Sequence, residues 1–208
     1  MKTFFIIVII AVLGYFGWQQ MQTQPDPATP TATVTDEVST TTDTSTSTTA
    51  SGKQVDNSKV TVAFTGFGPG KKHVGSFSDV RSDLKLDAKG DIAGSITVGV
   101  SSLSTDTEKV TEHLKTDDFF DTAKYPTATF TITNDLTAST CGGANVRCAA
   151  PYLYGNFTIH GVTKGVSFPV VRSADKYTAT FTIDMKEFGI DQTFANETVE
   201  LQVVVPIK

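Results

Sequence analysis

Hydrophobic and polar residues alternate along most of the chain from Ser58 to the C-terminus, as in β-strands that bury one face. In residues 127–133, for example, Ala128, Phe130 and Ile132 fall on one face and threonines fall on the other. About eight such segments follow one another with mostly short connections, a spacing typical of antiparallel sheets. The pattern predicts an all-β domain whose sheet closes into a barrel or folds into a sandwich.

One stretch has a different period. Val110 and Leu114 lie at helical spacing, and Tyr125-Pro126 then stops the helix, because the residue before proline is pushed toward extended geometry. We therefore expect one short α-helix in residues 106–114 and a strand from Thr127 onward. Residues 184–190 predict a short helical turn with Phe188 pointing inward.

The first residues are apolar almost throughout. After Lys2, residues 3–21 would span roughly 28 Å as a helix, against a hydrocarbon core of about 30 Å. Trp18 suits a membrane interface, and no small-x-small cleavage site follows the apolar run. Residues 1–21 are therefore expected to be an uncleaved transmembrane helix, with the rest of the chain exported to the periplasm or cell surface. If this segment is cleaved, the protein is secreted.

The composition then changes to Thr, Ser, Pro and Asp in residues 22–57, which contain almost nothing able to form a core. We expect a disordered, stalk-like linker with a root-mean-square reach of about 30–35 Å. The predicted organisation is an anchor or signal segment in residues 1–21, a linker in 22–57 and a β-barrel domain in 58–208.

Charge and cysteine content narrow the function. A formal net charge of -5 and a pI near 5.1 provide no basic surface for nucleic acid. The two cysteines, Cys141 and Cys148, are expected to form a disulfide in an exported protein, contributing about 2–3 kcal/mol in the loop-entropy model. Two cysteines without matched partners make a poor zinc site, so no metal is expected.

Candidate catalytic residues are few. His113 lies near Asp117, Asp118 and Asp121, but a histidine at a helix end beside solvated acids is more often a cap or a salt-bridge partner. The chain contains no Gly-rich phosphate loop, no Gly-x-Ser-x-Gly and no His-Glu-x-x-His. We therefore expect no catalytic residues, no required cofactor and no enzymatic activity.

Three stretches resemble a known family. Residues 112–130, Glu-His-Leu-Lys-Thr-Asp-Asp-Phe-Phe-Asp-Thr-Ala-Lys-Tyr-Pro-Thr-Ala-Thr-Phe, resemble the signature of the YceI-like family of polyisoprenoid-binding proteins. Residues 155–169 and 181–190 resemble it as well, and the similarity extends from about Asn57 to the C-terminus. Gly165 stands where family members often carry Pro, and Met185 stands where they often carry Arg, which bears on polar contacts at the mouth of the barrel.

The resemblance implies a lipocalin-like, eight-stranded antiparallel barrel with one short helix beside it. It also implies an apolar tunnel that holds an isoprenoid chain, such as a polyprenyl lipid or a prenyl quinone. Inward positions of the strands and of the helix end are expected to contact this lipid. They are Val62, Phe64, Phe77, Leu84, Ile96, Val98, Phe119, Phe120, Phe130, Ile132, Phe157, Ile159, Phe168, Phe181, Ile183, Phe188, Leu201 and Val203.

Two other functions stay open at this point. The 14 phenylalanines could simply fill the barrel, which would leave a non-catalytic surface display or adhesion domain on a Thr-rich stalk. A cavity of several hundred Å³ would favour lipid binding over that alternative. The third reading is an enzyme that uses His113 with Asp117 or Asp118 around a metal. The sequence leaves open whether the domain forms a homodimer.

Overall fold

The computed structural model describes residues 23–37, 53–87, 90–135, 152–191 and 196–208. Within these ranges the chain forms two six-stranded antiparallel sheets, a two-stranded ribbon and one α-helix. The predicted all-β class with a single α-helix is therefore confirmed for the described part of the chain.

The first sheet has the strand order β1-β11-β10-β9-β7-β4. Its strands are β1 (Thr33–Thr35), β11 (Val162–Pro169), β10 (Tyr152–Ile159), β9 (Thr127–Asp135), β7 (Ser95–Gly99) and β4 (Val80–Ser82). The register places Phe157 opposite Phe130 and Ile96 opposite Phe130, so inward residues of three neighbouring strands meet in one row.

The second sheet has the order β12-β13-β14-β2-β3-β8. Its strands are β12 (Val171–Arg172), β13 (Lys176–Asp184), β14 (Thr198–Pro206), β2 (Thr61–Gly68), β3 (Lys71–Phe77) and β8 (Leu103–Thr105). A separate ribbon pairs β5 (Lys85–Leu86) with β6 (Ile92–Ala93). Here Leu201 faces Phe64 and Phe181, which continues the apolar row across the second sheet.

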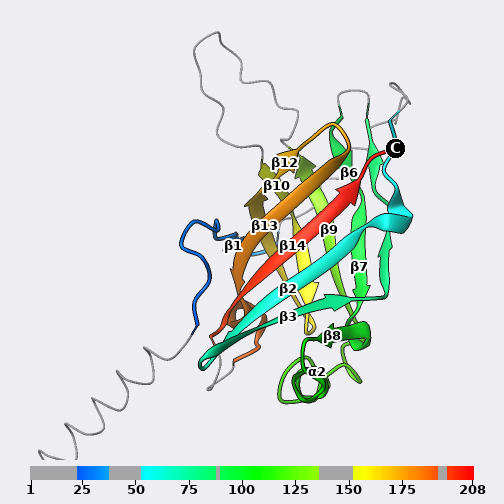
Figure 1. Cartoon of the computed structure of the whole chain (residues 1–208). Coiled ribbons are helices and arrows are strands. Elements are labelled where there is room, and N and C mark those ends of the chain that lie inside the picture. Colours follow the sequence, from blue (N-terminus) through cyan, green and yellow to red (C-terminus); the bar gives the residue numbers. More distant parts are fainter. Residues whose placement is uncertain (1–22, 38–52, 88–89, 136–151, 192–195) are drawn as a thin grey trace, which may run out of the picture.

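The two sheets enclose the hydrophobic core between them. Figure 1 shows β13, β14, β2 and β3 crossing in front of β10, β9 and β7. Phe188, Leu103 and Ile183 are the largest side chains with less than 2 % of their surface exposed. The alternation of the strands therefore places one apolar face of each sheet toward the other, as the sequence indicates.

The prediction of a closed eight-stranded barrel is wrong, because the described strands form two separate open sheets. The chain passes from one sheet to the other at corners where pairing stops. One corner is the bend at residues 78–79 between β3 and β4. Another follows Pro169, which has no N–H with which to continue the ladder of β11. Periodicity reports which face of a strand is buried, but it does not report whether the edge strands pair.

Part of the segment expected to be a disordered linker is folded onto the sheets. Residues 30–35 lie in the seam between β13 and β11: Thr31 bridges Thr182, and Thr33–Thr35 pair with β11. Ala32 is only 7 % exposed and Val34 packs against the core. A Thr- and Pro-rich composition suggests a linker, but threonine also favours β-strands, and here Thr33–Thr35 form one. Val55 likewise bridges Ile207, so pairing begins before residue 58.

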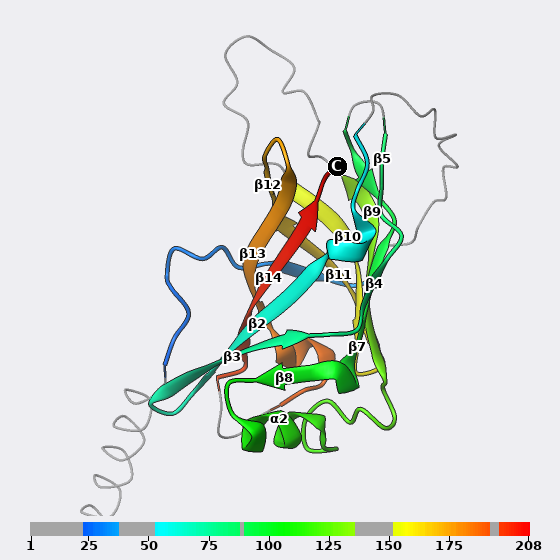
Figure 2. The same cartoon turned by 45° about the vertical axis from the view of Figure 1, so that its right-hand side comes forward.

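Helix α2 (Glu108–Lys115) lies below β8 at one end of the sheets, as Figure 2 shows. It buries Thr111 and Leu114 and lies close to the predicted range. Three 3₁₀ turns complete the described elements: η1 (Asn57–Lys59), η2 (Val100–Ser102) and η3 (Met185–Phe188). The predicted helical turn at residues 184–190 is thus present as η3.

Two predictions concern residues outside the described ranges. The expected transmembrane helix of residues 1–21 and the expected disulfide between Cys141 and Cys148 both fall there. Among the described residues, no helix has the length and apolar character needed to cross a membrane.

Candidate functional site

Two adjoining cavities lie between the sheets. The first, here called the inner cavity, has a volume of about 100 Å³ and lies among the middle strands. The second, here called the helix-end cavity, has a volume of about 680 Å³ and is bounded by α2 and the β2–β3 hairpin. Both are lined by Val98, Ala128, Phe157 and Leu201, so the two volumes meet at this common wall.

The wall of the inner cavity is apolar. Its only polar side-chain group belongs to Tyr177, whose hydroxyl donates a hydrogen bond of 2.7 Å to the carbonyl oxygen of Gly90. Tyr177 is only 3 % exposed. Because this hydroxyl is already paired, the inner cavity presents hydrocarbon to any occupant.

Three aromatic rings narrow the inner cavity. The Phe168 and Phe181 rings stack with centroids 4.0 Å apart, and the Phe130 ring lies 5.2 Å from Phe168. Gly155 makes room for this cluster, since a Cβ there would lie 2.4 Å from Phe130 Cζ and from the carbonyl oxygen of Thr131. The rings fill much of the space between the sheets, which explains why the larger void lies at the α2 end.

The segment after α2 forms one side of the helix-end cavity. Thr116 ends the helix, and backbone hydrogen bonds from Phe120 N–H to Leu114 and from Asp121 N–H to Thr116 fold the chain back. Asp121 takes a positive φ of 43° in this turn, a conformation that Asp tolerates better than most residues. The turn brings Phe119 and Phe120 together with centroids 4.9 Å apart, and both rings line the cavity.

Polar side chains mark the rim of the helix-end cavity. We define this rim as the polar lining residues, which are His73, His113, Asp118, Asp191 and Asn196. They come from β3, from α2 and from the segments that follow α2 and η3 or precede β14. His113, Asp118 and Asp191 are exposed, so the rim faces solvent while the wall behind it is apolar.

An ion-pair cluster holds β3 against the chain before α2. The Nδ1–H of His73 donates to Asp106 Oδ1 at 2.8 Å, and Lys71 Nζ lies 3.1 Å from Asp106 Oδ2. The hydrogen bond from His73, which is the larger cause, and the hydrogen bond from Lys71 hold the pKa of Asp106 below its ordinary value. The cluster fixes the orientation of the His73 ring at the rim.

Most of the residues expected to contact lipid line the cavities. Those on the inner cavity alone are Val62, Leu84, Ile96, Phe130, Ile132, Phe168, Phe181 and Val203. Those on the helix-end cavity alone are Phe64, Phe77, Phe119, Phe120 and Ile159. Val98, Phe157 and Leu201 line both.

Ile183 and Phe188 line neither cavity and belong to the solid core instead. Both are 0 % exposed, and the Phe188 ring packs edge-on against Phe157 at 5.2 Å. The reason is the η3 turn. Asp184 accepts a hydrogen bond from Lys186 N–H at its start, and Gly189 ends it in a left-handed conformation.

Several further lining residues are absent from the predicted lipid contacts. Tyr177, Ala179 and Val205 continue the period-two pattern of β13 and β14, so the signal for them was present. Met185, which replaces the Arg frequent in the family, is 5 % exposed and lines the helix-end cavity. The rim residues have no local pattern, because they converge from separate segments.

Metal binding finds no support in the described residues, where no group of three or more His, Cys, Asp or Glu side chains is placed to hold an ion. Within that part of the chain, His113 instead lies next to Phe119, with ring centroids 6.3 Å apart.

Comparison with known proteins identifies the family. The model of the YceI-like domain matches residues 53–207. A UPF0312 protein of Shewanella sp. (strain ANA-3) is 33% identical over 146 residues, which cover 64% of this chain and 72% of the relative. A UPF0312 protein of Shewanella baltica (strain OS155) has the same identity and coverage.

Solved structures share the fold. BcnA of Burkholderia cenocepacia aligns with a TM-score of 0.60 and 21% identity over 74% of this chain and 99% of BcnA. A polyisoprenoid binding domain from Saccharophagus degradans, implicated in plant cell wall breakdown, aligns with a TM-score of 0.51 and 17% identity over 75% and 97% of the two chains. With most of its length matched by the family model, the chain belongs to the YceI-like domain family.

Proposed function

We propose that this protein binds a long-chain apolar lipid of the isoprenoid class in the space between its sheets, and that it carries or sequesters this lipid without chemical change. The observation that supports this most directly is the helix-end cavity, with a volume of about 680 Å³ behind a polar rim. Ligand sites in proteins commonly have volumes of about 300–1,000 Å³.

The shape of the space favours an elongated ligand with one polar end. The helix-end cavity would hold the part of the chain next to the rim, and the inner cavity would take the chain end. Each Å² of apolar ligand surface removed from water contributes about 25 cal/mol, before the costs of ordering the ligand are subtracted. A methyl-branched isoprenoid chain can contact the Phe, Val, Leu and Ile side chains that line both cavities.

Similarity to known proteins favours an isoprenoid as the ligand. The chain belongs to the YceI-like family, and the related fold from Saccharophagus degradans is described as a polyisoprenoid binding domain. We extend this ligand class to the present protein as part of the proposal. Membrane tethering through residues 1–21 and an exported location also belong to the proposal and rest on the sequence pattern.

The alternative of a display domain with a filled interior is disfavoured by the cavity volume. The helix-end cavity opens at the rim and has a volume of about 680 Å³, and its largely apolar wall faces water unless a ligand covers it, which is unfavourable.

The test is a binding titration with delipidated protein. A long-chain prenyl quinone is expected to bind saturably, whereas a quinone with the same head group and no prenyl chain is expected to bind much more weakly. Ala128→Phe, which adds a ring at the wall shared by the two cavities, should reduce binding of the long chain. Val204→Phe is the matched control, because Val204 is partly exposed and lines neither cavity. Equal binding by both variants, or no uptake by the unmodified protein, would contradict the proposal.

A further inference from the structure

The chain arrives at the rim of the helix-end cavity immediately after the predicted membrane anchor. Thr23 donates two hydrogen bonds to the carbonyl oxygen of Gly68, from its N–H at 3.1 Å and from its hydroxyl at 3.0 Å. Asn196 Nδ2 donates to Gln24 Oε1 at 2.9 Å. Gly68 and Asn196 both line the helix-end cavity, so residues 23 and 24 are attached to its edge.

The residues that follow hold this attachment in place. We call residues 23–35 the strap. Thr29 donates to Glu200 Oε2 at 3.1 Å on β14, and Ala32 N–H donates to the Thr182 carbonyl at 2.8 Å on β13. The strap then joins β11 as strand β1. It is therefore fixed to both sheets and cannot swing away from the rim as a free tether could.

The position of the strap changes how the domain can sit relative to a membrane. Only Gln22 lies between Met21, the end of the predicted anchor, and Thr23. At about 3.5 Å per residue, the rim must lie within roughly 10 Å of the point where the anchor leaves the bilayer. The Thr- and Ser-rich residues 38–52 come after the strap, so they do not separate the anchor from the domain.

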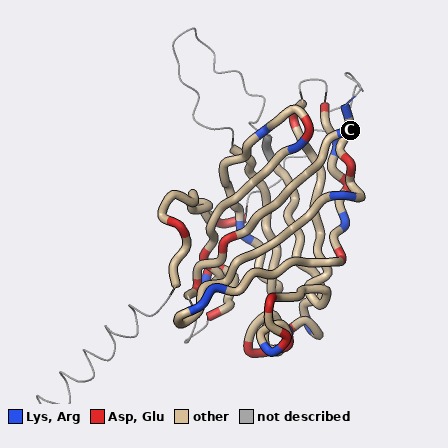
Figure 3. Tube along the Cα trace, in the orientation of Figure 1, with Lys and Arg blue, Asp and Glu red and all other residues tan. Residues whose placement is uncertain are grey.

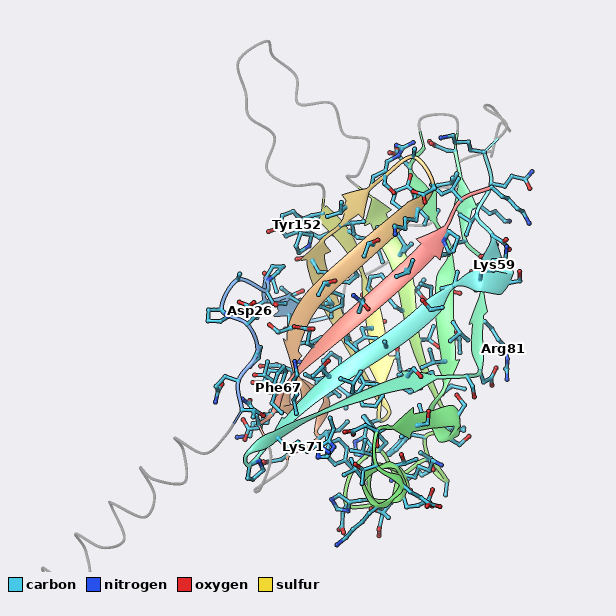
Figure 4. All side chains as sticks on the ribbon, viewed as in Figure 1. Asp26, Lys59, Phe67, Lys71, Arg81 and Tyr152 are labelled. Atoms are coloured by element: carbon cyan, nitrogen blue, oxygen red, sulfur yellow. The ribbon has the colours of Figure 1, made fainter. Side chains whose placement is uncertain are left out.

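The charge at this end of the molecule is mixed, with two lysines at the tip of the β2–β3 hairpin and the carboxylates of Asp118 and Asp191 on the rim. Lys71 and Lys72 begin β3 at the tip of the β2–β3 hairpin, and both are exposed. Figure 3 shows this basic tip beside the start of the described chain, and Figure 4 shows Lys71 and Phe67 there, far from Lys59.

We propose that the rim of the helix-end cavity faces a lipid bilayer and is held there by the strap, so that the apolar ligand passes between bilayer and cavity without crossing bulk water. This inference rests on the proposed function and adds an orientation to it. The YceI-like domain model begins at residue 53, so the strap lies outside the matched region.

The test measures which end of the full-length protein approaches lipid. In a Cys141→Ser, Cys148→Ser background, a fluorescent label is placed at Val74→Cys or at Lys59→Cys. Val74 is 53 % exposed on β3, and Lys59 precedes β2, about 20 Å away along the strand at roughly 3.3 Å per residue. The protein is reconstituted in vesicles of phosphatidylcholine and phosphatidylglycerol that contain a nitroxide-headgroup lipid. Quenching is expected to be at least about twofold stronger at position 74.

Two insertions test whether the strap causes this orientation. A flexible Gly-Ser insertion of about 20 residues between Gln22 and Thr23 adds a reach of about 25 Å and should abolish the difference between the two labels. The same insertion between Ser45 and Thr46 follows the strap and should preserve the difference. Equal quenching of both labels in the unmodified chain, or a difference that survives the first insertion, would overturn the inference.

Failure of the orientation can be told apart from failure of lipid binding. A protein that takes up prenyl quinone in the titration but shows equal quenching at both labels would retain the proposed function and lose the orientation. Full-length protein that does not associate with the vesicles at all would overturn the orientation as well.

Discussion

Small residues decide how much free space the sheets contain. Gly155 lies where the β9–β10 pairing shifts register, and its missing side chain leaves room for the Phe130 ring. Gly66, by contrast, lines the helix-end cavity and has no heavy atom within 4 Å of where a Cβ would be. Gly155 is therefore needed for the packing of the Phe130 ring, whereas Gly66 borders open space that could hold a larger side chain.

We expect Gly155→Ala to destabilise the fold by about 1–3 kcal/mol, because the added methyl group collides with a ring and with backbone that cannot move freely. Gly66→Ala serves as the control and should change the free energy of unfolding by less than about 0.5 kcal/mol. Chemical denaturation of both variants measures the difference. Equal stability of the two would show that the site around Phe130 is looser than described.

The Asp106 cluster gives the fold a dependence on acid. The pKa of Asp106 is lowered in the folded state by hydrogen bonds from His73 and Lys71, so its contribution to stability is complete above the ordinary aspartate pKa of about 3.9. That contribution is lost as the pH falls through the lowered value. We expect the stability advantage of the wild-type protein over Asp106→Asn to shrink as the pH falls below about 4.

Denaturation curves collected over a pH series measure this advantage. The effect should be small, since Asp106 is exposed and its partners are screened by solvent. An advantage that grows as the pH falls below about 4 would have the wrong sign for a carboxylate with a lowered pKa.

At the scale of elements, the strap and α2 cover parts of the core that the two sheets leave exposed. The strap occupies the seam between β11 and β13, and α2 with its following turn lies across one end. Both elements have few apolar residues, and they place these against the core: Ala32 and Val34 from the strap, and Val110, Leu114, Phe119 and Phe120 from the helix segment. Their contribution is therefore concentrated in a few side chains.

Ala32→Asp should release the strap and lower the stability by about 2 kcal/mol or more, because it places an unpaired carboxylate in the seam. Thr33→Asp, at the exposed neighbouring position, is the control and should have little effect. Thermal denaturation and limited proteolysis within residues 23–37 measure both consequences. If the two variants melt together and are cleaved at equal rates, the strap is not fixed through Ala32.

Phe119→Asp combined with Phe120→Asp should weaken retention of the bound lipid by at least about tenfold, or about 1.4 kcal/mol. The reason is that both rings line the helix-end cavity, and carboxylates would place charge against the apolar chain. Tyr154→Asp is the control, since Tyr154 is 38 % exposed and lines neither cavity. Unchanged retention in a folded double variant would count against this wall as part of the site.

For the whole molecule, the sequence predicts the faces of the strands better than their assembly. Phe130, Phe157 and Phe181 were assigned inward from a period of two, and they lie on cavity walls. The division into two open sheets depends on corners such as Pro169, where loss of pairing leaves no periodic signal. The strap was missed because its threonines resemble those of a linker, and the rim was missed because its members come from distant segments.

The central claim is that the space between the sheets holds an apolar lipid. Native mass spectrometry of the protein purified from its own host, followed by organic extraction, tests this most directly. We expect a bound mass in stoichiometric amount that organic solvent releases as an isoprenoid lipid, and that the emptied protein takes up again. A protein that is consistently empty and does not take up a prenyl quinone would contradict the account.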